Sequence, residues 1–94
     1  MNELSDLNAL RQLFETGGVW RRNELAEAMG MPDRSVRNMI RQLRITGVPI
    51  KACTGGGYKL ATDQEEIDEI VADYMHRARE EIYAAVAIQR GGIK

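Results

Sequence analysis

The sequence predicts a mainly α-helical fold, with a three-helix core, a small β-hairpin and one long helix after them. Three observations predict it. Apolar residues recur at three- and four-residue spacing in three successive segments, each followed by glycine. Two short runs typical of strands flank a glycine-rich stretch. A long segment without glycine or proline comes next. Together these features indicate a small core that carries a long helical extension.

The first two predicted helices lie at residues 4–15 and 23–29. Four apolar residues give the first helix a single stripe: Leu7, Leu10, Leu13 and Phe14. Asn23 is the expected N-cap of the second helix, because its short side chain can accept a hydrogen bond from the first turn. Gly30 is the expected left-handed residue at the end of that helix, and Pro32 cannot continue it.

The third predicted helix, residues 33–46, has one apolar side and one cationic side. Positions i, i+4 and i+7 are apolar and are expected to be buried: Val36, Ile40 and Leu43. At about 100° per residue, the opposite side carries Arg34, Asn38 and Arg41. Residues that border this set are Ser35, Arg37 and Gln42. Gly47 is the expected stop, so the helix should present its cations to solvent.

A β-hairpin is predicted over residues 50–61, from two short strand-like segments at 49–53 and 58–61. The turn between them is Thr54-Gly55-Gly56-Gly57. Because side chains alternate along a strand, one set should face the core: Ile50, Ala52, Tyr58 and Leu60. Lys51 and Lys59 should then point outward.

The long helix is predicted from a capping box at residues 62–65 to Arg90. It covers roughly 27 residues, or about 40 Å at 1.5 Å per residue. Its apolar side consists of Ile67, Val71, Tyr74, Met75, Ala78, Ile82, Ala85 and Val86. The first turns, as far as Met75, can pack back on the core, but the later residues need another partner. Pairing with a second copy of the chain supplies one, and we favour an antiparallel pair because acidic residues dominate 63–73 and basic residues come later.

Four short motifs occur in the order found in one family of DNA-binding domains. They are Leu25-Ala26, the turn residue Gly30, the buried Val36, and Gly57-Tyr58-Lys59-Leu60. Residues 4–61 therefore resemble a winged helix-turn-helix domain of the biotin-repressor type. The architecture, with its charged C-terminal helix, is also similar to small phage and prophage DNA-binding proteins.

The chain departs from the family pattern at the turn and beyond the hairpin. The family often has serine where this sequence has Pro32, so we expect Asp33 to cap the third helix. Biotin repressors continue into a ligase domain, and no such sequence follows here, so that enzymatic activity is not implied.

The resemblance implies contacts with double-stranded DNA. The major groove is about 12 Å wide and admits one helix, where Arg can bind guanine and Asn can bind adenine. Expected base contacts from helix 33–46 are Arg34, Ser35, Asn38 and Arg41. Expected phosphate contacts are Arg37 and Arg44 on the helix, and Arg21 and Arg22 before the second helix. The wing is expected to contribute Lys51, Thr54 and Lys59.

The charge differs between the two parts of the chain, as two separate roles would require. The composition argues against a membrane protein, a secreted protein, a metalloprotein and an enzyme. Residues 1–62 hold nine basic and six acidic residues, a net charge of +3, whereas residues 63–94 carry −4. Cys53 is the only cysteine, which suits a reducing cytoplasm, and we see no secretion signal and no apolar run long enough for a membrane span. His76 has no neighbouring ligand residues, and no catalytic set is present, so we expect neither a metal, a cofactor nor an enzyme.

We therefore expect a sequence-specific transcriptional regulator with two parts. Residues 1–61 form the DNA-binding domain, and residues 62–94 form a helix for homodimerisation or assembly. Two alternatives stay open. One is a DNA-engaging adaptor subunit of a phage packaging or replication assembly, and the other is a winged helix that binds only proteins.

Overall fold

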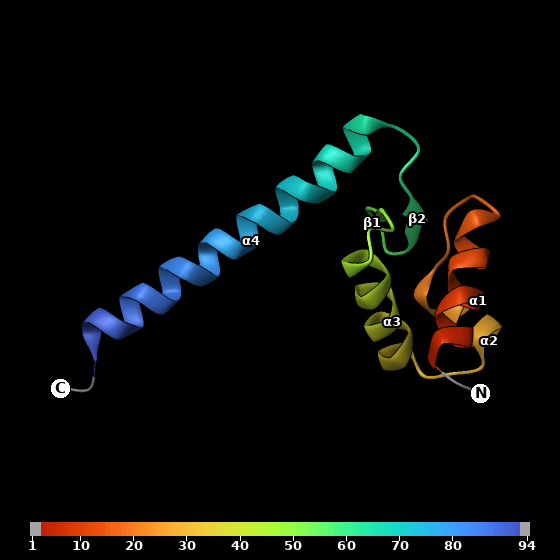
Figure 1. The fold of residues 1–94 in the computed structure, drawn as a ribbon, viewed down its shortest axis with the longest axis horizontal. Helices are drawn as coiled ribbons and strands as arrows, with labels where there is room; N and C mark the ends of the chain where they lie inside the picture. The colour runs from red at the N-terminus through yellow and green to blue at the C-terminus, as the bar shows by residue number, and fades with distance from the viewer. Residues whose placement is uncertain (1–2, 93–94) are drawn as a thin grey trace.

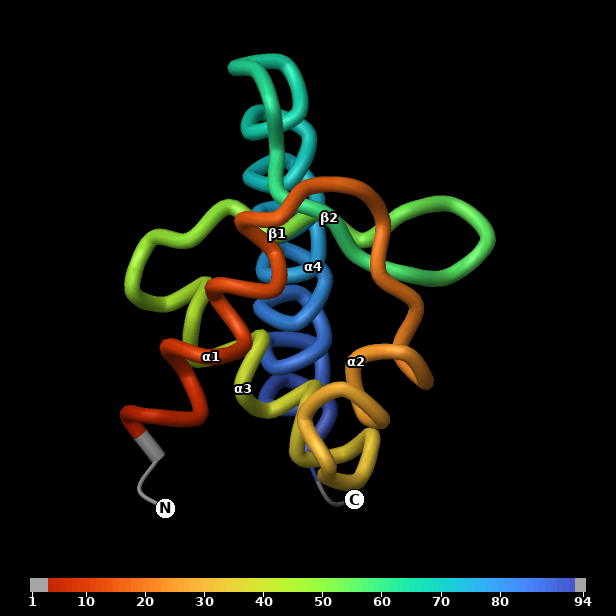
Figure 2. Tube along the Cα trace, turned by 90° about the vertical axis from the view of Figure 1, so that its right-hand side faces the viewer, coloured from red at the N-terminus to blue at the C-terminus, as the bar shows by residue number. Residues whose placement is uncertain are grey.

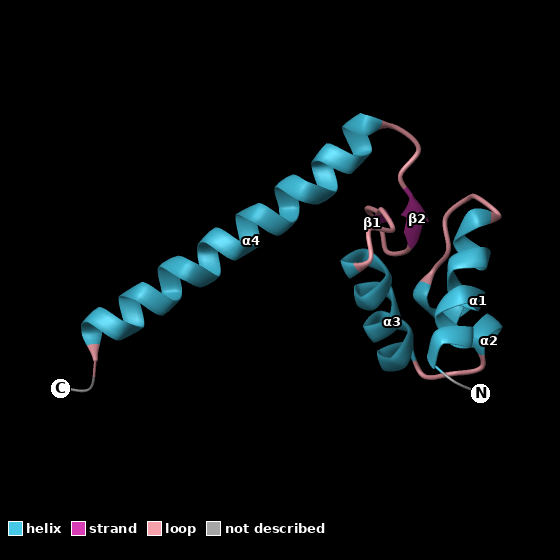
Figure 3. Ribbon diagram, viewed as in Figure 1, coloured by secondary structure: helices cyan, strands magenta, loops and turns pink. Residues whose placement is uncertain are grey.

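Residues 3–92, the part of the chain described by this computed structural model, contain four helices and one two-stranded hairpin. In chain order these are α1 (Glu3–Glu15), α2 (Arg22–Met29), α3 (Asp33–Ile45), β1 (Ile50–Ala52), β2 (Tyr58–Leu60) and α4 (Gln64–Gly91). The first three helices and the hairpin gather at one end of the molecule, and α4 leaves the hairpin and extends away from them (Figure 1). Figure 3 shows how small the strand content is beside the helices. The predicted mainly helical fold, with a hairpin and a long C-terminal helix, is confirmed.

One hydrophobic core lies between α1, α2, α3 and β1. Its buried side chains are Leu10, Phe14, Leu25, Val36, Met39, Ile40, Leu43 and Ile50. Half-buried Trp20, Tyr58 and Leu60 pack against this core. Burying one large apolar side chain stabilises a fold by about 1.5–3 kcal/mol. The helix α4 has no buried residue, so it contributes no side chain to the core that holds α1, α2 and α3 together.

The buried side of α3 is the side that the apolar spacing predicted. Val36, Ile40 and Leu43 are 0, 2 and 5% exposed. Met39 is also buried, so four side chains of this one helix enter the core. The helix ends at Ile45, one residue earlier than expected, and Gly47 follows with a φ of 103°.

The predicted N-caps of α2 and α3 are wrong, although the predicted end of α2 is right. Arg21 rather than Asn23 caps α2, because the backbone N–H of Arg21 donates to the Glu24 carboxylate at 2.8 Å. Pro32 rather than Asp33 precedes the first turn of α3, without a side-chain cap. Gly30 ends α2 in the left-handed conformation, with φ 65° and ψ 36°, as predicted.

The hairpin attaches to the core through β1 and through the link between α1 and α2. Ile50 pairs with Leu60, and Ala52 with Tyr58, in antiparallel register. Trp20 adds a one-residue bridge, with backbone N···O distances to Tyr58 of 2.8 and 2.7 Å. The predicted inward face is right for Ile50 but wrong for Ala52, which is exposed. The reason is that the chain leaves the core there, and the loop after β1 projects to one side (Figure 2).

The start of α4 differs by one residue from the predicted capping box. Asp63, not Thr62, is the N-cap, and its carboxylate accepts a hydrogen bond from the Glu66 N–H at 2.9 Å. The Glu66 carboxylate reaches back to Thr62 and accepts from its N–H and its hydroxyl at 2.9 and 2.7 Å. Glu66 therefore takes the place of Glu65, the last residue of the capping box predicted at residues 62–65.

The rest of α4 stands away from the core. Ile67 and Ile70 are half-buried where the helix packs against β1. From Val71 to Gly92 every described side chain is exposed, so the expected packing as far as Met75 stops at Ile70. No helix within residues 3–92 is both long and apolar enough to cross a membrane.

Candidate nucleic-acid interface

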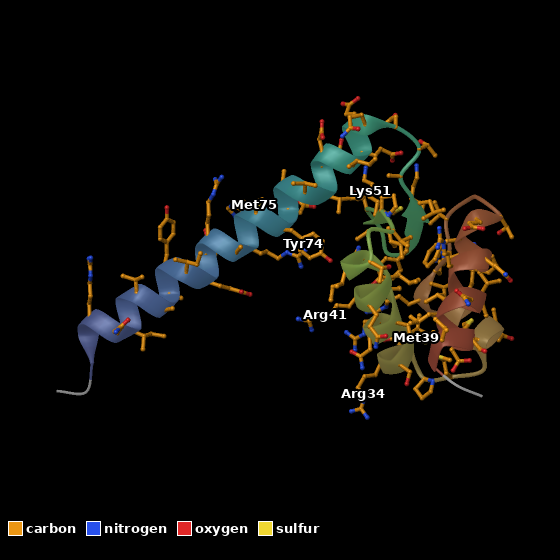
Figure 4. The ribbon with its side chains drawn as sticks, in the orientation of Figure 1. Arg34, Met39, Arg41, Lys51, Tyr74 and Met75 are labelled. Carbon is orange, nitrogen blue, oxygen red and sulfur yellow. The ribbon has the colours of Figure 1, made fainter. Side chains whose placement is uncertain are left out.

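The outward side of α3 carries the cations that the sequence placed there. Arg34, Asn38 and Arg41 are exposed and lie opposite the buried side of the helix. In Figure 4 the side chains of Arg34 and Arg41 point away from the core, while Met39 points toward it. Ser35, in contrast, is half-buried on the other flank.

A cleft of about 700 Å³ separates this side of α3 from the middle of α4. The charged side chains around it are Arg34, Arg37, Arg41, Arg44, Arg77 and Glu81. Asn38, Tyr58 and Tyr74 also line it. Of its described lining residues only Glu81 is acidic, so the cleft carries five positive charges against one negative charge. Such a cleft attracts anions.

Arg44 helps to form the closed end of this cleft. Its Nε donates to the Ile50 carbonyl oxygen at 2.9 Å. Its guanidinium carbon lies 5.9 Å from the ring centre of Tyr58 and 5.6 Å from that of Tyr74. Arg77 lies 4.7 Å from the centre of the Tyr74 ring. The Tyr74 ring thus contacts Arg44 of α3 and Arg77 of α4. The contacts of Arg44 with Tyr58, Tyr74 and the Ile50 carbonyl oxygen hold its guanidinium against the hairpin.

Two of the expected phosphate-binding arginines share one carboxylate. The Arg37 Nε lies 3.1 Å from one Asp33 oxygen, and the Arg22 Nε lies 3.5 Å from the other. That second oxygen accepts no hydrogen bond, so its contact with Arg22 is electrostatic. All three side chains are substantially exposed, and pairs of this kind contribute little to stability. Asp33 therefore orients the two arginines and reduces their net charge.

Arg21 and Arg22 lie beside the tip of the hairpin. With Asn23, Asp33 and the glycines 55–57 they surround a second cavity of about 470 Å³. Thr54 is exposed at the same tip. These expected contacts line a different cavity from the arginines of the cleft, and Asp33 links the two groups through Arg22 and Arg37.

The hairpin lysines point outward as predicted, but they are already paired with α4. Lys51 Nζ lies 2.6 Å from a Glu69 oxygen and 3.5 Å from a Glu66 oxygen. Lys59 Nζ lies 2.9 Å from Glu66. The hydrogen bond from Lys59, with those from Thr62, lowers the pKa of Glu66 from 4.5 to about 2. The hydrogen bond to Glu69 raises the pKa of Lys51.

These ion pairs fix the direction in which α4 leaves the hairpin. They also neutralise both lysines, so neither is a free cation on the hairpin surface. The sequence does not indicate this pairing, because Glu69 is 18 residues from Lys51 and Glu66 is seven from Lys59, and no helical or strand periodicity connects either pair.

The predicted dimerisation residues divide into three groups. Ile67 packs at the hairpin, while Tyr74 and Ala78 line the cleft. The remaining residues are exposed on α4: Val71, Met75, Ile82, Ala85 and Val86. Ile82 is 60% exposed, and Figure 4 shows Met75 directed away from α3. This set is the apolar stripe of α4.

Three residues near the interface were missed. Arg77 and Glu81 belong to the cleft through the course of α4, which the sequence does not specify. Ile45 is 80% exposed at the end of α3, about 180° from Val36 and so on the same side as Asn38. The angle of Ile45 around the helix, opposite Val36, could have predicted from the sequence that its side chain is exposed.

Comparison with models of known protein families finds none that matches the chain. Within residues 3–92 no three His, Cys, Asp or Glu side chains are grouped in a way that could hold a metal ion.

Proposed function

We propose that residues 1–61 form a winged helix-turn-helix domain that binds double-stranded DNA in a sequence-specific manner. In this proposal α3 enters the major groove, and the hairpin is the wing. The observation that carries it is the division of α3 into two sides. Val36, Ile40 and Leu43 are buried, which leaves Arg34, Asn38 and Arg41 exposed on the outward side, where they also line the cleft toward α4.

The side chains of that outward face suit base recognition. Arginine can bind guanine O6 and N7 together, and asparagine can bind adenine N6 and N7 together. The neighbouring cations Arg37 and Arg22 suit phosphate contacts, which set the register of a protein on the duplex. We infer that the role is transcriptional regulation. The proposed location is the cytoplasm, because the lone Cys53 suits a reducing compartment.

Selection of bound sequences from a random duplex pool tests the proposal. We expect enrichment of a short motif. Arg41→Ala should weaken binding to that motif by about 5- to 150-fold, since one good bidentate contact contributes about 1–3 kcal/mol of discrimination. Gln12→Ala, on the exposed side of α1, is the control and should bind normally. Failure of the wild-type chain to bind any duplex at low salt would overturn the proposal and favour a winged helix that binds only proteins.

We further propose that two copies pair through the apolar stripe of α4, which would present two α3 helices to two half-sites. Antiparallel pairing is favoured, because Asp68 and Arg90 both flank the stripe near opposite ends of the helix. Ile82→Glu should then convert a dimer into a monomer in sedimentation. Ile88→Glu is a matched control, since Ile88 is also exposed but lies about 240° away around the helix.

A DNA-engaging adaptor subunit is the second candidate. The observation in its favour is that α4 has 28 residues, none of them buried, which is a large surface for assembly. Light scattering separates the two candidates. A closed dimer supports a regulator, whereas a larger ring, or a monomer that assembles only with another protein, supports an adaptor.

A further inference from the structure

We propose that the cleft between α3 and α4 holds one phosphodiester strand of the bound duplex, and that Arg77 of α4 contacts its phosphates. The inference rests on the proposed function, because it requires α3 to lie in the major groove. It adds a binding surface on the long helix and gives α4 a role on DNA besides assembly.

The position of α4 relative to α3 supports this arrangement. A helix in the major groove has a sugar-phosphate strand on each side of it. On one side of α3 the next element outward is α4, with Arg77 on its facing wall. A strand between the two helices would meet Arg37 and Arg44, the expected phosphate contacts, on the α3 wall and Arg77 on the α4 wall.

The shape of the cleft also fits an extended chain. The Arg44 and Tyr74 contacts close it at the hairpin end. From there the axes of α3 and α4 diverge toward the Arg34 end of α3 (Figure 1). Arg34, Arg41 and Arg77 line the cleft and are exposed, so it is open to solvent, unlike an enclosed small-molecule pocket.

Its charge favours phosphates over other extended chains. The facing walls carry arginines from both helices, and Glu81 is the one acidic residue among those described as lining the cleft. A phosphodiester strand brings a negative charge with every nucleotide. An acidic peptide is the other possible occupant in chemical terms, and the test below separates the two.

The structure also gives Arg77 a defined position although the helix around it is exposed. Glu66 and Glu69 bind Lys51 and Lys59, which anchors the first turns of α4. Arg77 lies eleven residues beyond Glu66, about 16 Å further along a continuous helix. Its contact with the Tyr74 ring directs the guanidinium toward the cleft.

Arg77→Ala and Arg79→Ala make a matched pair of variants. Both remove one arginine from the same exposed segment, but the two positions lie about 200° apart around the helix, and only Arg77 lines the cleft. Binding to duplexes is measured by fluorescence anisotropy over a range of salt concentrations. Arg77→Ala should weaken binding to the selected motif and to an unrelated duplex by the same factor, about five- to tenfold near 0.1 M salt. The slope of log K against log salt should fall by about 0.9. Arg79→Ala should change affinity by less than about twofold.

Glu81→Gln provides a test of opposite sign that a damaged fold cannot imitate. Removing the carboxylate that faces the phosphates should strengthen binding to every duplex at least about twofold. Glu80→Gln is its control, because Glu80 lies about 100° from Glu81 around the helix, is not among the residues that line the cleft, and lies 3.8 Å from His76.

The outcomes separate this inference from the proposed function. If Arg41→Ala weakens binding but Arg77→Ala and Arg79→Ala behave alike, α3 reads DNA and the strand does not pass through the cleft. If the wild-type chain binds no duplex, the proposed function itself fails. If it binds a poly-glutamate peptide more tightly than duplex DNA, and Arg77→Ala abolishes that binding, the occupant is an acidic peptide and the inference is overturned.

Discussion

A single methyl group added at Gly57 should loosen the attachment of the hairpin to the core. Gly57 has a φ of +115°, which L-amino acids other than glycine rarely adopt. A Cβ there would lie 3.0 Å from Val19 Cγ1 and 3.1 Å from the Trp20 carbonyl oxygen. Trp20 is also the residue whose backbone pairs with Tyr58 at 2.8 and 2.7 Å. The Gly57→Ala variant therefore combines backbone strain with a steric clash.

The size of each effect follows from these distances and angles. Backbone strain of this kind costs about 1–3 kcal/mol. Overpacking against a wall that includes backbone adds about 1–3 kcal/mol. Gly55 is a matched control because it has a φ of +89° but nothing within 4 Å of its Cβ position. The Gly55→Ala variant should show only the strain.

Thermal unfolding followed by circular dichroism compares the two variants. In a chain of this size 1 kcal/mol corresponds to about 4–8 °C in Tm. Gly57→Ala should therefore melt at least about 4 °C below Gly55→Ala, which itself melts below the wild type. Equal melting temperatures for the two variants would refute the argument that the Trp20 bridge packs closely against Gly57.

Two further predictions concern the core and the hairpin contact of α4. Phe14→Ala should cost about 3–5 kcal/mol in urea denaturation, because Phe14 is 1% exposed, and a cost below about 1 kcal/mol would contradict its place in the core. The Lys59 hydrogen bond lowers the pKa of Glu66 from 4.5 to about 2, so the stability that this carboxylate adds to the contact between α4 and the hairpin is fully present above pH 4.5 and is lost as the pH falls toward 2. Spin labels on Cys53 and on a cysteine at Ile88 should show a broadened distance distribution over that range while helicity is retained. A distribution unchanged at pH 2 would mean that other contacts hold α4.

The fold was predictable from the sequence where local periodicity decides it. Val36, Ile40 and Leu43 repeat at the spacing of one helical face, and this alone determines that Arg34 and Asn38 point outward. The helix caps were predicted less well. Several residues near each helix start can offer a hydrogen bond, and the choice depends on neighbours such as Glu24 at Arg21.

The position of α4 could not be predicted in this way. It depends on ion pairs that join Lys51 and Lys59 to Glu66 and Glu69 across two elements. Opposite charges in a sequence do not indicate which of them meet. For the same reason the sequence did not predict the cleft or the role of Arg77 in it. It did predict the residues of α3 that line the cleft, because their outward direction follows from helical periodicity.

Site-specific photocrosslinking from α3 to a duplex that carries the selected motif tests the central claim most directly. A photoreactive residue in place of Asn38 should crosslink to bases of the motif. The same residue in place of Asn8, which is exposed on α1, should give no base crosslinks. Equal crosslinking from both positions, or crosslinks from Asn38 only to protein, would contradict the account.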